Sequence, residues 1–201
     1  MNQLAAVADI ETFSKKENAV ITNVGCVIVN PITGEEVGTF YRRVAHQCLH
    51  NRERDTCEDT LRFWGRQKKD SPEAYDEVFT REKERLTLKD TLREFSDFLM
   101  KHFGDASRVV VYGNGPEFDC SILNNAYTHV GMPIPWFFWN QESLRTVNRL
   151  YVYKHGEKLT HKIPFEGRKH HALDDARFEA KVLIAGTQDY IGKPDGTARS
   201  A

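Results

Sequence analysis

The sequence has few cysteines, almost no net charge and no long apolar run. Its four cysteines, Cys26, Cys48, Cys57 and Cys120, are separated by 22, 9 and 63 positions. They form no C-x-x-C zinc knuckle, and a chain of this size needs no disulfide framework. No run approaches the roughly 20 apolar residues of a membrane-spanning helix, and the first residues lack a signal-peptide pattern. These absences predict a cytoplasmic protein with reduced thiols and no membrane partner.

Glycine-rich phosphate-binding motifs are also missing. Gly113 and Gly115 are too few and too differently spaced for a P-loop or a dinucleotide-binding fingerprint. With 201 residues, of which 40% are hydrophobic and 28% charged, the chain is long enough for one well-cored domain and short for two. We therefore expect a single domain over residues 1–190 and a flexible tail over 191–201.

The net charge of −1 hides an uneven distribution. Residues 42–69 carry eight Lys or Arg against four acids, and residues 145–171 carry seven against two. Either segment alone is typical of a solvated face or loop. Two basic segments beside a cluster of acids suit an enzyme that must hold a polyanion.

The apolar pattern predicts an α/β domain. Three strands, expected over 4–10, 20–29 and 37–44, form an antiparallel meander, and a fourth over 108–112 runs parallel to the first because a helix precedes it. A short final strand follows the aromatic run at 136–139. The periodicity predicts a short helix from residue 72 and longer ones over 57–68, 88–103, 117–130, 143–150 and 172–187.

Acidic residues recur where these elements begin or end. Asp9 and Glu11 lie two positions apart at the end of the first strand, so their side chains point to the same face. Two adjacent carboxylates repel unless a cation lies between them, and a hard divalent metal is the natural partner. A lone D-x-E is more often a solvated edge, but Asp119 opens one helix and the run 170–176, HHALDDA, opens another. The three motifs together indicate a metal site.

Helix geometry distinguishes the two aspartates of the last motif. At about 100° per residue, the face packed on the sheet holds Ala172, Ala176, Ala180 and Leu183. Asp175 lies at the border of that face beside Glu179, whereas Asp174 turns away from it. We therefore predict that Asp175 is the ligand and that His171 and Asp174 are exposed residues at the helix start.

These motifs resemble those of a known family. Asp9-Ile10-Glu11-Thr12, the mid-chain Asp119 and the five-residue step from His170 to Asp175 are similar to the three motifs of the DEDDh 3′–5′ exonucleases, the DnaQ-like branch of the ribonuclease-H-like fold. The resemblance spans about residues 4–187 and is greatest to the small phage-type and RNase AS-like exonucleases. It implies a mixed five-stranded α/β sheet whose first three strands are antiparallel, flanked by helices.

The resemblance also implies a reaction. Two Mg²⁺ or Mn²⁺ ions are held by four acids, Asp9, Glu11, Asp119 and Asp175. His170 acts as the general base. Zinc is the weaker candidate because no third His or Cys at ligand spacing joins His170 and His171. The implied activity releases nucleoside 5′-monophosphates from the 3′ end of single-stranded RNA or DNA, with RNA slightly favoured.

Four further residues are candidates for substrate binding. By resemblance, Thr12 and Phe13 hold the 3′-terminal nucleotide, with Phe13 stacking on a base, a contact that contributes about 1–3 kcal/mol. Trp64 is a second candidate base contact, and Asn114 a candidate contact to sugar or phosphate. For Phe13 and Trp64, packing in the core is an equally open alternative.

Other functions and assemblies stay open. One is a metal-dependent hydrolase of nucleotides or small phosphates. Another is a nucleic-acid-binding module without catalysis, which is disfavoured because it would not need four carboxylates facing a polyanion. The choice between RNA and DNA is also open, because a single hydrogen bond can read the 2′-hydroxyl. Several relatives pair as homodimers, and residues 136–139 are a candidate interface.

Overall fold

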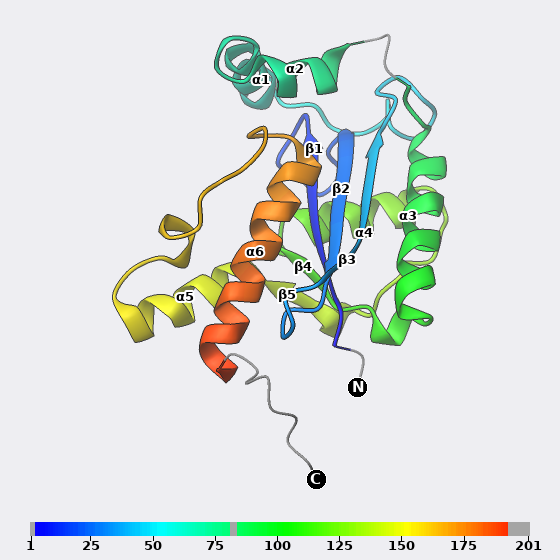
Figure 1. The fold of residues 1–201 in the computed structure, drawn as a ribbon. Coiled ribbons are helices and arrows are strands. Elements are labelled where there is room, and N and C mark those ends of the chain that lie inside the picture. The colour runs from blue at the N-terminus through cyan, green and yellow to red at the C-terminus, as the bar shows by residue number, and fades with distance from the viewer. Residues whose placement is uncertain (1–2, 81–83, 193–201) are drawn as a thin grey trace.

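A mixed five-stranded sheet forms the centre of the protein, whose computed structural model describes residues 3–80 and 84–192 (Figure 1). The strands are β1 (Ala5–Thr12), β2 (Ile21–Val29), β3 (Glu36–Arg43), β4 (Val111–Gly113) and β5 (Gln141–Ser143), arranged in the order β3-β2-β1-β4-β5. The pairs β1–β2 and β2–β3 are antiparallel, and β1–β4 and β4–β5 are parallel. The predicted sheet, with its first three strands antiparallel, is confirmed.

Helices cover both faces of the sheet and one of its ends (Figure 1). They are α1 (Glu58–Asp70), α2 (Pro72–Phe79), α3 (Leu88–Phe103), α4 (Asp119–His129), α5 (Leu144–His155) and α6 (Ala172–Ile191). Helix α6 lies across β1 and β2 on one face, and α3 and α4 pack on the other. The pair α1 and α2 sits above the end of β1, which is where the first acidic motif lies (Figure 1).

Alternation along β1 decides which layer each side chain enters. Ala6, Ala8 and Ile10 are buried against α3 and α4, whereas Ala5 and Val7 are buried against α6. Asp9 and Glu11 have the same parity as Ala5 and Val7, so they point to the α6 side. Every residue of β2 is buried, because the sheet is covered on both faces there.

The element boundaries differ from the expected ones at a few ends. Strand β1 continues to Thr12 because it stays paired with β2 up to that residue. Strand β4 begins only at Val111, since residues 106–108 form a 3₁₀ turn in which the Asp105 side chain accepts a hydrogen bond from the Ser107 N–H. Helix α6 continues to Ile191, so that residue belongs to the helix and not to the predicted tail. Residues 193–201 of that tail lie outside the described residues.

Helix α6, with 20 residues, is the longest helix within residues 3–80 and 84–192, and charged side chains such as Arg177 and Lys181 interrupt its apolar pattern. No helix in these two ranges is long and apolar enough to cross a bilayer.

Gly25 lets α6 rest directly on the sheet. It pairs with Asp9 across β1 and β2, and a Cβ at this position would overlap the backbone carbonyl of Ala172. The first turn of α6 therefore approaches the strands at a distance that only glycine allows.

Gly25→Ala is expected to push the start of α6 away from β2 and to lower the free energy of unfolding by about 1–3 kcal/mol, the usual cost of overpacking. Thermal denaturation measures the effect. Gly65→Ala is the matched control, because a Cβ there meets nothing within 4 Å and alanine favours the helix interior, so its melting temperature should be unchanged or higher. Equal melting temperatures for wild type and Gly25→Ala would contradict the close approach.

Candidate active site

Three chain segments bring the predicted acids to one end of the sheet. Asp9 and Glu11 come from the end of β1, Asp119 is the first residue of α4 after β4, and Asp175 lies in the first turn of α6. The Ile10 amide donates to Asp119 Oδ1 at 3.4 Å, which ties α4 to β1. Ligand atoms of Glu11, Asp175 and His170 lie within 4.8 Å of one another. The three sequence motifs thus meet in space.

Burial and mutual repulsion dominate the electrostatics of this cluster. Burial, followed by repulsion from neighbouring carboxylates, raises the pKa of Asp9 and of Glu11 well above their usual values. Burial raises the pKa of Asp119 from 3.8 to about 7, although the Ile10 amide works against the shift. It also raises the pKa of Asp175 from 3.8 to about 6. Within the described part of the chain, Asp9 Oδ2 is buried without a hydrogen-bond partner. Such a site favours a cation.

Glu179 is a fifth acid, named above only as a neighbour of Asp175. It lies one helical turn after Asp175, is 8% exposed, and has no partner for Oε2 among the described residues. Burial, then repulsion from Asp119 and Asp175, raises its pKa well above the usual value. The spacing of four from Asp175 on the packed side of a helix was the signal that could have identified it.

His170 lies beside two of the acids. Its backbone has a left-handed φ of 65°, and the edge of its ring meets Phe63 of α1 with centroids 5.0 Å apart. Burial, and then the nearby Lys169, lowers the pKa of His170 below 6.5. The imidazole is therefore largely neutral at neutral pH and can accept a proton.

The prediction that His171 and Asp174 are exposed was wrong. His171 is 2% and Asp174 9% exposed, because the loop at 167–171 folds back over the start of α6. Asp174 Oδ2 accepts hydrogen bonds from the Arg168 backbone N–H at 3.0 Å and from Arg168 Nε at 2.8 Å. Burial acts to raise the pKa of Asp174, but these bonds outweigh it and lower the pKa. We call Arg168, His171 and Asp174 the loop clamp.

The loop clamp also reaches the sheet and the helical pair. The His171 ring stacks on Tyr41 of β3 with centroids 4.5 Å apart, and its Nε2 is 2.9 Å from Arg168 Nη2. Arg168 Nη1 lies 3.7 Å from the buried Glu77 of α2. His170 is thus carried by a segment that is fixed on both sides.

The two predicted aromatic substrate contacts lie in the core instead. Trp64 is 1% exposed, and its Nε1 donates to the Thr12 carbonyl at 2.9 Å. Phe13 is 6% exposed and packs between His46 and Phe79. Both rings belong to one buried cluster with Val20 and Val78, so neither is presented to solvent for a base. Of the two alternatives left open for Phe13 and Trp64, base contact or packing in the core, both residues follow the second.

The other two substrate candidates lie next to the acids. The Thr12 side chain is buried and donates to the Ser14 carbonyl at 2.6 Å, so this segment offers backbone rather than side-chain contacts. Asn114 is exposed in the turn between β4 and α4. A backbone hydrogen bond from Asn114 helps to hold down the pKa of Asp119, which places this residue at the edge of the site.

The strand order, with helices on both faces of the sheet, is that of the ribonuclease-H-like fold, and the nuclease domain of a DEDDh family member shares it. Residues 5–186 match the family model described as the 3′-5′ exoribonuclease Rv2179c-like domain, and the chain belongs to this family of 3′–5′ exonucleases. No curated protein matched the sequence significantly.

Solved structures share this fold at low sequence identity. The nuclease domain of 3′hExo, a DEDDh family member bound to rAMP, superposes with a TM-score of 0.62 at 17% identity, covering 95% of this chain and 94% of that one. Cell-death related nuclease 4 (CRN-4) gives 0.67 at 16% identity, covering 94% and 64%. Exonuclease I of E. coli with a dA16 oligonucleotide gives 0.63 at 13%, covering 92% and 41%.

Proposed function

We propose that the protein removes nucleoside 5′-monophosphates from the 3′ end of single-stranded nucleic acid, with RNA slightly preferred over DNA. The observation that carries the proposal is the meeting of Asp9, Glu11, Asp119 and Asp175 beside His170 at one end of the sheet. Family membership supports the direction of attack. The family description supports RNA, whereas one structural neighbour holds a DNA oligonucleotide.

The four acids would hold two Mg²⁺ or Mn²⁺ ions. The donor set fits, because hard divalent ions prefer carboxylate oxygens and the site has a buried oxygen on Asp9 that finds no hydrogen-bond partner among the described residues. Such ions, when bound, stabilise charge on the attacking and leaving oxygens of a phosphodiester. The DEDDh neighbours support the use of a divalent metal, and one of them was solved in a zinc-bound form.

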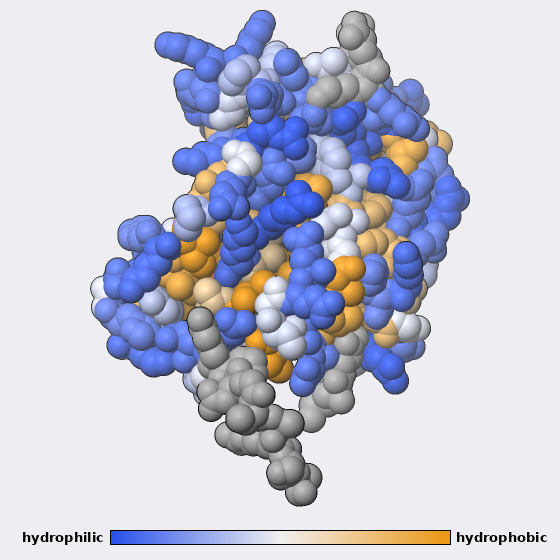
Figure 2. Space-filling view, viewed as in Figure 1, coloured by the Kyte–Doolittle hydropathy of each residue, from blue (hydrophilic) through white to orange (hydrophobic). Residues whose placement is uncertain are grey.

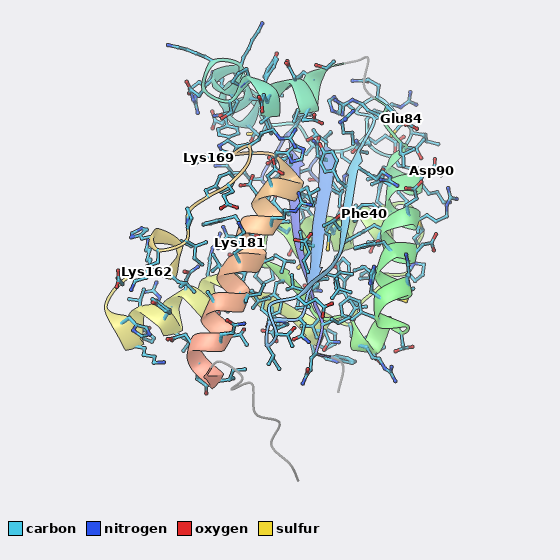
Figure 3. All side chains as sticks on the ribbon, in the orientation of Figure 1. Phe40, Glu84, Asp90, Lys162, Lys169 and Lys181 are labelled. Carbon is cyan, nitrogen blue, oxygen red and sulfur yellow. The ribbon has the colours of Figure 1, made fainter. Side chains whose placement is uncertain are left out.

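The chain's own residues would orient the substrate and move one proton. His170 would accept the proton of the attacking water, since its lowered pKa leaves the imidazole neutral at pH 7. Lys169 lies on the same loop, at the start of α6 below α1 and α2 (Figure 3), where its charge would attract phosphates. The surface around this end is mostly hydrophilic (Figure 2).

A time course on 5′-labelled single-stranded RNA and DNA of one sequence tests the proposal. The reactions contain Mg²⁺, Mn²⁺ or a chelator, and Asp175→Ala is the inactive control. Metal-dependent ladders that shorten from the 3′ end are expected, and the faster ladder identifies the preferred sugar. Cleavage of mononucleotide phosphates alone would favour the small-phosphate hydrolase, and binding without any cleavage would favour the non-catalytic module.

Asp174→Ala is expected to lower the cleavage rate by roughly 10- to 100-fold, because releasing the loop clamp lets His170 leave its position. Single-turnover rates across pH separate this role from a general loss of folding. The Mg²⁺ affinity should stay within about twofold, since Asp174 binds Arg168 and not the metal site. Asp189→Ala is the control, because this half-buried acid in the last turn of α6 pairs with Lys154 and His155 of α5, far from the loop. A loss of metal binding in Asp174→Ala would contradict the positioning role.

We also propose that the protein forms a homodimer through the aromatic run. Phe137, Phe138 and Trp139 are 41%, 79% and 60% exposed, whereas Trp136 is 2% exposed and belongs to the core rather than to the predicted interface. Exposed neighbouring aromatics are enriched at protein interfaces. Light scattering after size exclusion should give twice the monomer mass for the wild type. The Trp139→Ser variant should give a lower mass, closer to that of the monomer.

A further inference from the structure

Two histidines and a glutamate meet on the surface, apart from the acidic site. His50 and Glu53 lie in the loop between β3 and α1, and His129 is the last residue of α4. One ligand atom of each lies within 4.8 Å of the other two. His129 Nε2 is 3.6 Å from Glu53 Oε2, and the rings of His50 and His129 meet edge to face with centroids 5.6 Å apart.

Buried anchors hold the loop that carries two of these residues. Asn51, next to His50, is fully buried, and its side chain accepts from the Ile21 N–H at 3.2 Å and donates to the Ile21 carbonyl at 2.8 Å. The loop therefore cannot slide along β2 without breaking both bonds.

Arg54, next to Glu53, ties the same loop to α4. It is 6% exposed, and its Nε donates to the Ala19 carbonyl at 2.7 Å while Nη1 donates to Asn125 Oδ1 at 3.0 Å. Asn125 is on α4, one turn before His129. Glu53 and His129 are thus held in register by the neighbouring, partly buried hydrogen bond between Arg54 and Asn125.

The backbone of His50 supports the same view of a fixed arrangement. Its φ is 71°, in the left-handed region that costs a non-glycine residue about 1 kcal/mol or more. In this conformation the imidazole of His50 is in edge-to-face contact with the ring of His129.

We propose that His50, Glu53 and His129 form a binding site for one first-row transition-metal ion, with Zn²⁺ as the main occupant. Two imidazoles and one carboxylate are a donor set that zinc uses, whereas Mg²⁺ prefers oxygen ligands alone. In a tetrahedral site with bonds of about 2.0–2.1 Å, neighbouring ligand atoms lie roughly 3.4 Å apart. The observed 3.6 Å between His129 and Glu53 needs only a small adjustment. A fourth position faces solvent and would take water.

This site is separate from the acidic one. Asp119 is the first residue of α4 and His129 the last, so the two ends lie about 15 Å apart at 1.5 Å per residue. An ion bound here would join the loop before α1 to α4 and stabilise the folded protein by an amount that grows with the logarithm of the ion concentration relative to its dissociation constant. It would not enter the hydrolysis proposed above, and the inference does not depend on that function.

Cobalt is the probe, because Co²⁺ occupies zinc sites and absorbs visible light according to its ligands. The full chain is titrated with Co²⁺ in excess Mg²⁺, which is added to compete for the acidic site, and then with Zn²⁺. We expect one equivalent of Co²⁺ to bind, with a visible band that one equivalent of Zn²⁺ removes. His129→Ala and Glu53→Gln should each weaken Co²⁺ binding at least tenfold, and His129→Ala should lose the band.

Two controls make the outcome decisive. His161→Ala removes a histidine from an exposed turn outside the cluster and should leave the titration unchanged. Melting temperatures of all variants without metal establish that they fold, and Glu53→Gln, a change at an exposed side chain, remains informative if His129→Ala does not. Wild-type Co²⁺ binding in both cluster variants, or its loss in Asp175→Asn, would overturn the proposal.

Discussion

Asp119→Asn is expected to slow nucleic-acid hydrolysis by orders of magnitude and, at the same time, to make the metal-free protein more stable at pH 8. Asparagine keeps the oxygen that accepts the Ile10 amide but loses the negative charge that would hold a metal. The rate should fall roughly 10²- to 10³-fold, the scale seen when a group that stabilises transition-state charge is removed. Single-turnover cleavage of labelled RNA measures this loss.

The gain in stability follows from burial of the same charge. A carboxyl group whose pKa rises from 3.8 to about 7 on folding destabilises the ionised native state by roughly 4 kcal/mol at most. The neutral amide of Asp119→Asn removes that penalty, so the melting temperature in chelator should rise. Asp97→Asn, at an exposed position on α3, is the matched control and should change neither property. A lower melting temperature for Asp119→Asn in chelator would show that the ionised acid is better solvated than its burial indicates.

Mg²⁺ or Mn²⁺ is expected to raise the melting temperature strongly at pH 8 and hardly at all at pH 5. Metal binding needs ionised carboxylates, and protons compete for them up to about pH 6 at Asp175 and about pH 7 at Asp119. At a metal concentration 100 times the dissociation constant, the stabilisation is about 2.7 kcal/mol. For a domain of this size that corresponds to roughly 5–10 °C. Scanning calorimetry with and without metal measures it.

The metal-free protein tests the sign of the underlying linkage. Raised carboxyl pKa values stabilise the fold below about pH 4, and this stability is lost as pH rises through 6 and 7. Buried histidines act in the opposite direction, because desolvation lowers the pKa of His46 to about 4 and that of His171 below its usual value. Comparing the pH dependence of stability of wild type and Glu179→Gln separates the contribution of the acids from that of the histidines. This variant should lose less stability than wild type between pH 5 and 8, and an identical pH dependence would place Glu179 outside the cluster.

The sequence predicted the parts of the site that local geometry determines. Period-two alternation placed Asp9 and Glu11 on one face, and helical periodicity placed Asp175, rather than Asp174, nearer the packed side of α6. Both follow from residues that are close in the chain, so no knowledge of the tertiary structure was needed.

Residues whose environment depends on distant segments were harder to predict. His171 and Asp174 are buried because Tyr41 of β3 and the loop at Arg168 cover them, and neither contact is visible in the helix pattern. Whether Trp64 lies on the surface or in the core depends on how α1 and α2 sit above β1, which packing decides rather than sequence periodicity. The cluster of His50, Glu53 and His129 joins residues more than 70 positions apart. It could not be predicted from the sequence, because it also depends on contacts between distant segments.

The position of α6 in the chain has a consequence for the order of folding. Strands β1 to β3 pair locally through short connections, whereas β4 and then α6 reach β1 from more than 100 residues away. Contacts of such long sequence separation form late, and domains grow from the N-terminus during synthesis. The acids of β1 are therefore made first and the partners on α6 last. With the roles proposed for His170 and Asp175, a nascent chain can cut only when nearly the whole domain has been made.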